Sequence, residues 1–172
     1  DAGVGDARLL SRAPRSSIRE LAFSPDGATL AWLAADCLGT CEASLATIAV
    51  DGPPGVRAID ERVAVDSSLS WDASGSSLLI VRTADGPAIS LVGAGDRRVV
   101  DLLDVGRLGA DVSARPRWVA GGSAIVIEVS AAQDGATAGV RGPVTLWRMD
   151  PDGSDLVVLV RDTAGGDLGR LP

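Results

Sequence analysis

The sequence contains no histidine, lysine, tyrosine or asparagine, and all 16 of its basic residues are arginine. Without histidine, a Ser-His-Asp triad, a Cys-His pair and a histidine-ligated metal site are excluded. Without lysine or tyrosine, a Schiff-base lysine, the lysine of a phosphate-binding loop and a tyrosine nucleophile are also excluded. Two cysteines cannot form a structural zinc site by themselves. Carboxylates, serine, threonine and arginine remain for catalysis.

Basic residues are too few for a nucleic-acid-binding protein, because 23 acidic residues outnumber them and the formal net charge is -7. Phosphate binding needs clustered basic side chains, and only Arg97–Arg98 and Arg115/Arg117 are closely spaced. No apolar run approaches the roughly 18 residues of a membrane span. We therefore expect no nucleic-acid partner, no membrane span and no cofactor. At 172 residues the chain suits one domain or part of one.

Three segments repeat the same spacing of an aromatic residue, a glycine and an apolar residue. The glycine follows the aromatic residue by four positions and precedes the apolar residue by three. The aromatic residues are 48 and then 47 positions apart. Each segment reads as a hairpin, because glycine accepts the positive φ that a tight turn requires. The three sets are Phe23/Gly27/Leu30, Trp71/Gly75/Leu78 and Trp118/Gly122/Ile125.

A second pair of apolar strands follows each hairpin, so each unit contains four strands. Four antiparallel strands at a period of roughly 40–50 residues are typical of a β-propeller blade. We therefore predict an all-β fold with three consecutive four-stranded antiparallel blades, and at most a helical turn near residues 102–108. The expected divisions are a leading outer strand and linker at 1–16, blades at 17–62, 63–108 and 109–162, and a C-terminal tail at 163–172.

The residues Phe23-Ser-Pro-Asp-Gly27 resemble the hairpin motif of TolB-like, or WD-like, propeller repeats. Asp150-Pro-Asp-Gly-Ser154 resembles the later turn of the same repeat. The resemblance covers about residues 18–161 and is strongest in the first unit. It implies a rigid, non-catalytic disc, usually outside the cytoplasm, that presents loops to a protein partner. Some relatives are instead fused to peptidases and control access to them.

The number of blades does not match a closed propeller, because propellers have roughly 4–8 blades. Three blades leave apolar faces and strand edges bare. Self-association of two copies would make six blades, and a longer propeller of which this chain is a segment would also cover the faces. A leading strand at residues 7–11 favours the segment, because the third unit already has its own outer strand at 156–160.

The two cysteines, Cys37 and Cys41, frame a three-residue loop between the second and third strands of the first unit. A disulfide across this loop is geometrically possible and would indicate an oxidising compartment. The alternatives are a redox pair or two free thiols. We predict the disulfide, and with it a secreted or cell-envelope location.

One acidic turn near the C-terminus resembles the start of a calcium loop, with Asp150, Asp152, Ser154 and Asp155. Its twelfth position is Arg161 instead of an acidic residue, and Asp-Pro-Asp-Gly is an ordinary turn sequence. We therefore predict a turn without metal.

Carboxylates expected on the first strand of each blade could serve a glycosidase that works with acidic residues alone. These candidates are Glu20, Asp66 and Asp111. Three blades form no complete channel, so solvated surface carboxylates are the favoured interpretation, and we predict no catalytic residues.

The tryptophans and one long loop are the candidates for binding. Trp71 and Trp118 share the repeated aromatic position, so we expect both to be buried and equivalent between blades. The segment 130–143 is longer than its counterparts, and long insertions often carry binding or remain disordered. Exposed aromatic side chains frequently anchor interfaces. The candidate interface residues are Trp32, Trp147, Gln133 and Arg141.

Together these patterns favour a non-catalytic module that binds or scaffolds proteins outside the cytoplasm. The partner would be another protein or a second copy that completes the propeller. The alternative is the propeller domain of a larger peptidase or glycosidase whose catalytic residues lie elsewhere.

Overall fold

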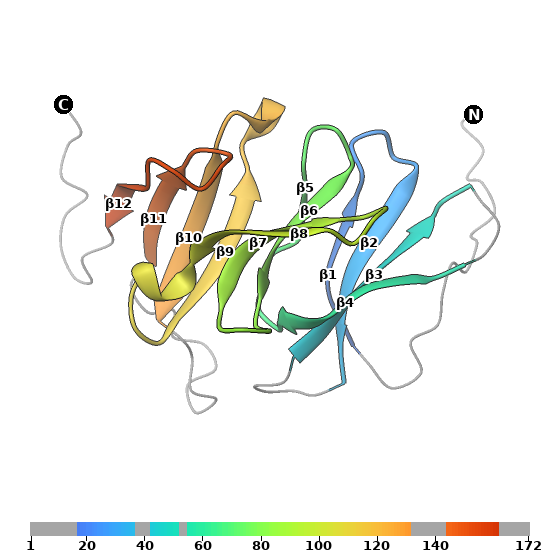
Figure 1. The fold of residues 1–172 in the computed structure, drawn as a ribbon, viewed down its shortest axis with the longest axis horizontal. Helices are drawn as coiled ribbons and strands as arrows, with labels where there is room; N and C mark the ends of the chain where they lie inside the picture. Colours follow the sequence, from blue (N-terminus) through green and yellow to red (C-terminus); the bar gives the residue numbers. More distant parts are fainter. Residues whose placement is uncertain (1–16, 37–41, 52–54, 132–143, 162–172) are drawn as a thin grey trace, which may run out of the picture.

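The computed structural model describes residues 17–36, 42–51, 55–131 and 144–161, and within them the chain is all-β (Figure 1). The strands form blades of four antiparallel strands, as the repeats predict. Two 3-10 turns, η1 (Val105–Arg107) and η2 (Ala120–Gly122), are the only helical elements in these ranges. The predicted leading strand at residues 7–11 and the tail at 163–172 lie outside the described residues.

The three blades follow one another along the chain, from blue to red in Figure 1. Blade 1 contains β1 (Ser17–Phe23), β2 (Thr29–Ala35), β3 (Glu42–Ala49) and β4 (Arg57–Ala64). Blade 2 contains β5 (Ser70–Trp71), β6 (Ser77–Arg82), β7 (Ala88–Gly93) and β8 (Val99–Asp104). Blade 3 contains β9 (Val112–Trp118), β10 (Ile125–Ala131), β11 (Val144–Met149) and β12 (Val157–Arg161). Since β4 continues past residue 62, Val63 can pair with Arg82 of β6 and join the first two blades.

The two strands of each hairpin pair in the same register in all three blades, and this shared register accounts for the repeated spacing in the sequence. The aromatic residue pairs with the apolar residue three positions after the glycine in every blade. The turn glycines have φ values of 73° at Gly27, 72° at Gly75 and 73° at Gly122. Only glycine adopts this region without a steric cost, so its fixed position sets the register of each hairpin.

Two hydrophobic clusters fill the spaces between consecutive blades, and β6 contributes to both. Leu78 and Ile80 belong to the cluster shared with blade 1, whereas Leu79 and Val81 belong to the cluster shared with blade 3. Successive side chains of a strand point to opposite faces, so a strand between two blades needs apolar residues at every position. The uninterrupted run from residue 78 to 81 is therefore explained by packing on both sides.

The repeated aromatic residues have the same place in each blade but differ in burial. Trp71 is 8% exposed, and its Nε1 donates a hydrogen bond to the carbonyl oxygen of Ala22 at 3.1 Å. Trp118 is half-buried, so it is less enclosed than expected. Phe23 is 56% exposed. The burial of this position depends on the blade that lies against it.

Candidate functional site

Charged side chains of blades 1 and 3 meet where the inner strands of the blades lie side by side. Strand β5 contacts both β1 and β9. Glu20 on β1 forms ion pairs with two arginines of β9: its Oε1 is 3.0 Å from Arg117 Nη2, and its Oε2 is 3.6 Å from Arg115 Nη2. The two arginines reach the same carboxylate because residues two apart on a strand share a face. We call Glu20, Arg115 and Arg117 the axial cluster.

The axial cluster carries an excess of positive charge in an acidic protein. Two guanidinium groups face one carboxylate, and the side chain of Glu20 is only 21% exposed. The Nε of Arg115 is buried and has no hydrogen-bond partner among the described residues. Arginine stays protonated and only donates hydrogen bonds, so it cannot act as a base. The cluster is therefore suited to holding a carboxylate or a carbonyl oxygen.

The other two carboxylates proposed for a central channel stand at the starts of inner strands. Asp66, ahead of β5, accepts a hydrogen bond from the hydroxyl of Ser113. Asp111 is exposed directly before β9 and has a φ of 50°. Within the described ranges, no three acidic or cysteine side chains are grouped so that they could hold a metal ion.

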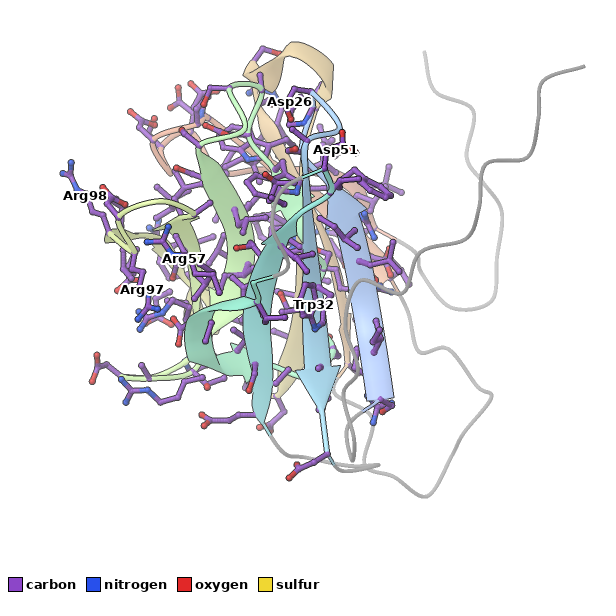
Figure 2. All side chains as sticks on the ribbon, turned by 90° about the vertical axis from the view of Figure 1, so that its right-hand side faces the viewer. Asp26, Trp32, Asp51, Arg57, Arg97 and Arg98 are labelled. Atoms are coloured by element: carbon purple, nitrogen blue, oxygen red, sulfur yellow. The ribbon has the colours of Figure 1, made fainter. Side chains whose placement is uncertain are left out.

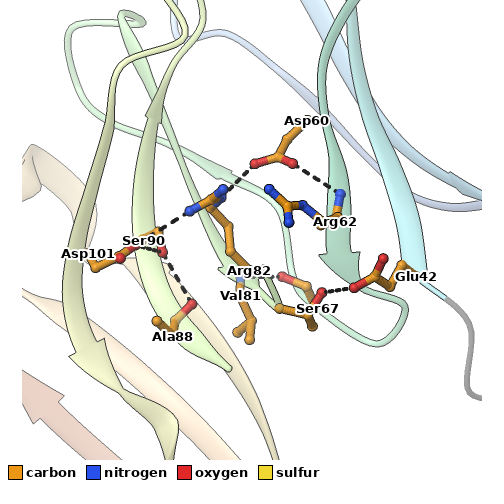
Figure 3. Close-up of polar contacts among 10 residues, drawn as sticks. Glu42, Asp60, Arg62, Ser67, Val81, Arg82, Ala88, Ser90 and Asp101 are labelled. Atoms are coloured by element: carbon orange, nitrogen blue, oxygen red, sulfur yellow. Dashed lines mark hydrogen bonds and ion pairs between the residues drawn. The ribbon is translucent and has the colours of Figure 1, made fainter. Parts of the chain in front are cut away.

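A second polar cluster, drawn in Figure 3, joins blade 1 to blade 2. The Nε of Arg82 on β6 lies 2.6 Å from Oδ2 of Asp60 on β4, and both side chains are largely buried. Arg82 Nη1 lies 3.8 Å from Oδ1 of Asp101 on β8, which also accepts a hydrogen bond from Ser90. The backbone N–H of Arg62 donates to the other oxygen of Asp60. These contacts are internal to the fold, so we assign this cluster to stability.

The structure places two of the four candidate interface residues. Trp32 lies on the side of β2 away from blade 2 and is 8% exposed (Figure 2). Trp147 on β11 is half-buried, and its Nε1 is buried without a partner among the described residues. It lines an open cavity of about 420 Å³ together with Leu108, Val129 and Arg161. Gln133 and Arg141 lie outside the described residues, as do Cys37 and Cys41.

Turn carboxylates cap the backbone in the turn between β1 and β2 and in the turn between β11 and β12. Asp26 accepts from Ser24 and from the N–H of Ala28, and these bonds lower its pKa. Asp152 accepts from the hydroxyl and N–H of Ser154, and its pKa is also lowered. In the acidic segment that resembles the start of a calcium loop, Asp150 pairs with Arg148 at 3.0 Å and its carbonyl accepts from the N–H of Gly153. The segment is a hydrogen-bonded turn.

Asp72 provides a testable pH dependence of stability. Burial acts to raise its pKa, but hydrogen bonds from Ser74, Ser77 and Ser76 together outweigh burial and lower the pKa below 3.8. Because the folded-state pKa lies below the unfolded-state value, the stabilisation is complete above pH 3.8 and is lost as the pH falls through the folded-state pKa.

We expect Asp72→Ala to lower the free energy of unfolding at pH 7 by about 1–2 kcal/mol. The difference from the parent should shrink when urea denaturation is repeated from pH 7 down to the acid range. Asp72→Asn, which keeps an oxygen acceptor, should cost less. A difference that does not change with pH would contradict this assignment.

No helix in the described part of the chain is long and apolar enough to cross a membrane. No protein-family model and no curated protein sequence matches this chain.

Solved structures resemble the chain over most of its length. A structure described as TolB from Agrobacterium tumefaciens has a TM-score of 0.65 at 16% identity, over 90% of this chain and 52% of that one. TolB from Acinetobacter baumannii has a TM-score of 0.56 at 14% identity, over 87% of this chain and 39% of that one. A prolyl endopeptidase has a TM-score of 0.66 at 18% identity, over 91% of this chain and 23% of that one. The chain thus has a TolB-like β-propeller fold and spans about half the length of the Agrobacterium TolB structure.

Proposed function

We propose that this chain is a non-catalytic propeller module that binds or scaffolds proteins outside the cytoplasm. The proposal rests on the arrangement of charges in the axial cluster. Its one carboxylate is paired with two arginines, whose side chains are 38% exposed at Arg115 and 55% exposed at Arg117. Such a group can hold an acidic side chain or a backbone carbonyl of a partner.

A location outside the cytoplasm is supported by the similarity to TolB structures and by the predicted Cys37–Cys41 disulfide. Alkylation of the native protein without reductant, followed by mass spectrometry, tests the disulfide. We expect no label on either cysteine. Labelling of both would remove this support for export.

Photo-cross-linking of the full chain in its native host tests binding at the axis. A photoreactive residue would replace Val119, which follows β9 and is 37% exposed. The matched control is Val99 on the outer strand β8, which is 38% exposed. We expect one recurrent protein adduct at position 119 and none at 99.

The adduct at position 119 should disappear when Arg115 and Arg117 are both changed to serine. Adducts that form equally at both positions, or that persist without the arginines, would overturn the proposal.

The alternative function is that of a propeller domain within a larger hydrolase. The similarity to a prolyl endopeptidase, of which this chain matches 23%, favours it. The complete coding sequence discriminates between the two. A hydrolase domain on the same polypeptide, with measurable peptidase activity, would replace the binding proposal.

A further inference from the structure

The two end blades differ in the chemistry of their uncovered faces. In each blade, the face toward the preceding blade, the upstream face, carries the side chains three and five positions after the turn glycine. The opposite face, the downstream face, points toward the following blade and carries the side chains four and six positions after the turn glycine. In blade 2 these are Leu78 and Ile80 upstream and Leu79 and Val81 downstream, and all four are buried.

The two interfaces between blades repeat the same contacts. Trp71 packs in one cluster with Ala31 and Leu33 from the downstream face of blade 1. One blade later, Trp118, at the position equivalent to Trp71, packs with Ile125 in one cluster with Leu79 and Val81.

The turn glycines also meet the preceding blade in the same way. A β-carbon at Gly75 would lie 3.4 Å from Pro25, and one at Gly122 would lie 3.4 Å from Ala73. In both interfaces, an upstream face that contains a tryptophan therefore packs against small and branched aliphatic side chains of the preceding blade.

The upstream face of blade 1 has the same composition but no blade against it among the described residues. It carries Leu21 and Phe23 on β1, opposite Trp32 and Leu30 on β2. Leu21 and Phe23 are each 56% exposed, although Trp71, which holds the position of Phe23 one blade later, is buried. Trp32 on the same face is 8% exposed, so the exposed apolar part of this face lies on β1. Figure 2 views the protein from this side, with Trp32 in the middle of the face.

The downstream face of blade 3 departs from the repeat. Glu128 stands where Leu33 and Val81 are buried in the other two blades. In the sheet, Glu128 pairs with Arg115 on β9. Val126, two positions earlier on the same face, lies between Arg117 and Arg148. This face therefore carries charges where the other blades carry aliphatic side chains.

Exposed valines on outer strands do not distinguish the two ends. Val157 and Val160 of β12 are exposed, but Val99 and Val100 of β8 are exposed as well, and blade 2 lies between two neighbours. The difference between the ends lies in the inner strands and the middle of the sheets.

We propose that a further blade of the same repeat, from another stretch of polypeptide, covers the upstream face of blade 1, and that the downstream face of blade 3 receives no such blade. The covering sheet presents small and branched aliphatic side chains, as blades 1 and 2 do. A ring of two copies would press Glu128 against Phe23 and Leu30, and a carboxylate buried among apolar groups is strongly unfavourable. The inference does not depend on the proposed binding function.

The first test compares the two faces in the full chain. We expect micromolar protein to bind a hydrophobic dye and to associate in light scattering. Leu21→Ser with Phe23→Ser should lower dye binding by at least about twofold and abolish association. The matched double variant changes Val126 and Leu146, which lies beside Glu128 on the downstream face of blade 3, to serine and should leave both unchanged. Circular dichroism checks that each variant keeps the parent fold.

The second test supplies the missing blade. A second copy of residues 65–111 is inserted between residues 16 and 17, where it stands ahead of β1 as blade 2 stands ahead of β9. The copy carries Trp71→Ser, Leu78→Ser and Ile80→Ser, so that its own upstream face, against which no blade lies, is polar. The extended chain should be monomeric and should lose the dye binding. The same insert carrying Val81→Glu, which imitates blade 3, should keep both dye binding and association.

Three results would overturn the proposal. One is a parent chain that is monomeric and binds no dye. Another is a loss of association in the blade 3 variant equal to that in the blade 1 variant. The third is association that persists in the extended chain, which would assign the face to a second copy or to an unrelated protein.

Discussion

Arg82→Met should lower the free energy of unfolding by about 3–5 kcal/mol, because it leaves Asp60 buried without its cationic partner. The side chains of Arg82 and Asp60 are 14% and 11% exposed, and their charged atoms are 2.6 Å apart. A carboxylate in this setting cannot recover its hydration when the arginine is removed. Chemical denaturation of parent and variant measures the loss.

Arg148→Met is the matched control, because it breaks an ion pair of 3.0 Å whose side chains are 41% and 34% exposed. Solvent screens that pair, so the expected cost is below about 1 kcal/mol. The double variant Asp60→Leu with Arg82→Met should recover much of the stability, because no charge remains buried. Equal costs for Arg82→Met and Arg148→Met would show that the first pair is hydrated as well.

Gly153→Ala should cost about 2–4 kcal/mol, because the new methyl group meets the backbone of another blade. Gly153 has a φ of 87°, and a β-carbon there would lie 2.4 Å from the carbonyl oxygen of Leu102 on β8. The turn before β12 can accept alanine only by moving away from blade 2. Denaturant unfolding measures the cost.

Gly27→Ala is the control for the backbone strain alone. Both glycines end a Pro-Asp-Gly turn, and each donates its N–H to the carbonyl three residues earlier. Gly27 has a φ of 73°, but nothing lies within 4 Å of the β-carbon position. Its substitution should cost only about 1 kcal/mol. Equal losses of stability in Gly153→Ala and Gly27→Ala would show that the turn before β12 shifts at no cost in free energy. The contact with Leu102 would then not determine the effect of the substitution.

The axial cluster illustrates which parts of a site can be predicted from a sequence pattern and which cannot. Inner-strand placement predicts that Glu20 faces a central channel, and in the structure Glu20 forms ion pairs with two arginines of the inner strand of blade 3. In the sequence, Arg115 and Arg117 stand out only as a closely spaced basic pair, although their alternation along a predicted inner strand indicates that they share a face. Their pairing with Glu20 could not be predicted, because 97 positions separate Arg117 from Glu20 and no local rule brings them together.

The sequence by itself determined the strands, the hairpin registers and the three-blade order. These features depend on local chemistry: a glycine with positive φ, a turn carboxylate and alternating apolar residues within a few positions. Only the tertiary structure decided that Asp60 meets Arg82, that Gly153 touches β8, and that Phe23 is exposed while Trp71 is buried. The physical reason is that burial and charge pairing depend on which blade lies against a residue, and equivalent residues of a repeat have different neighbours.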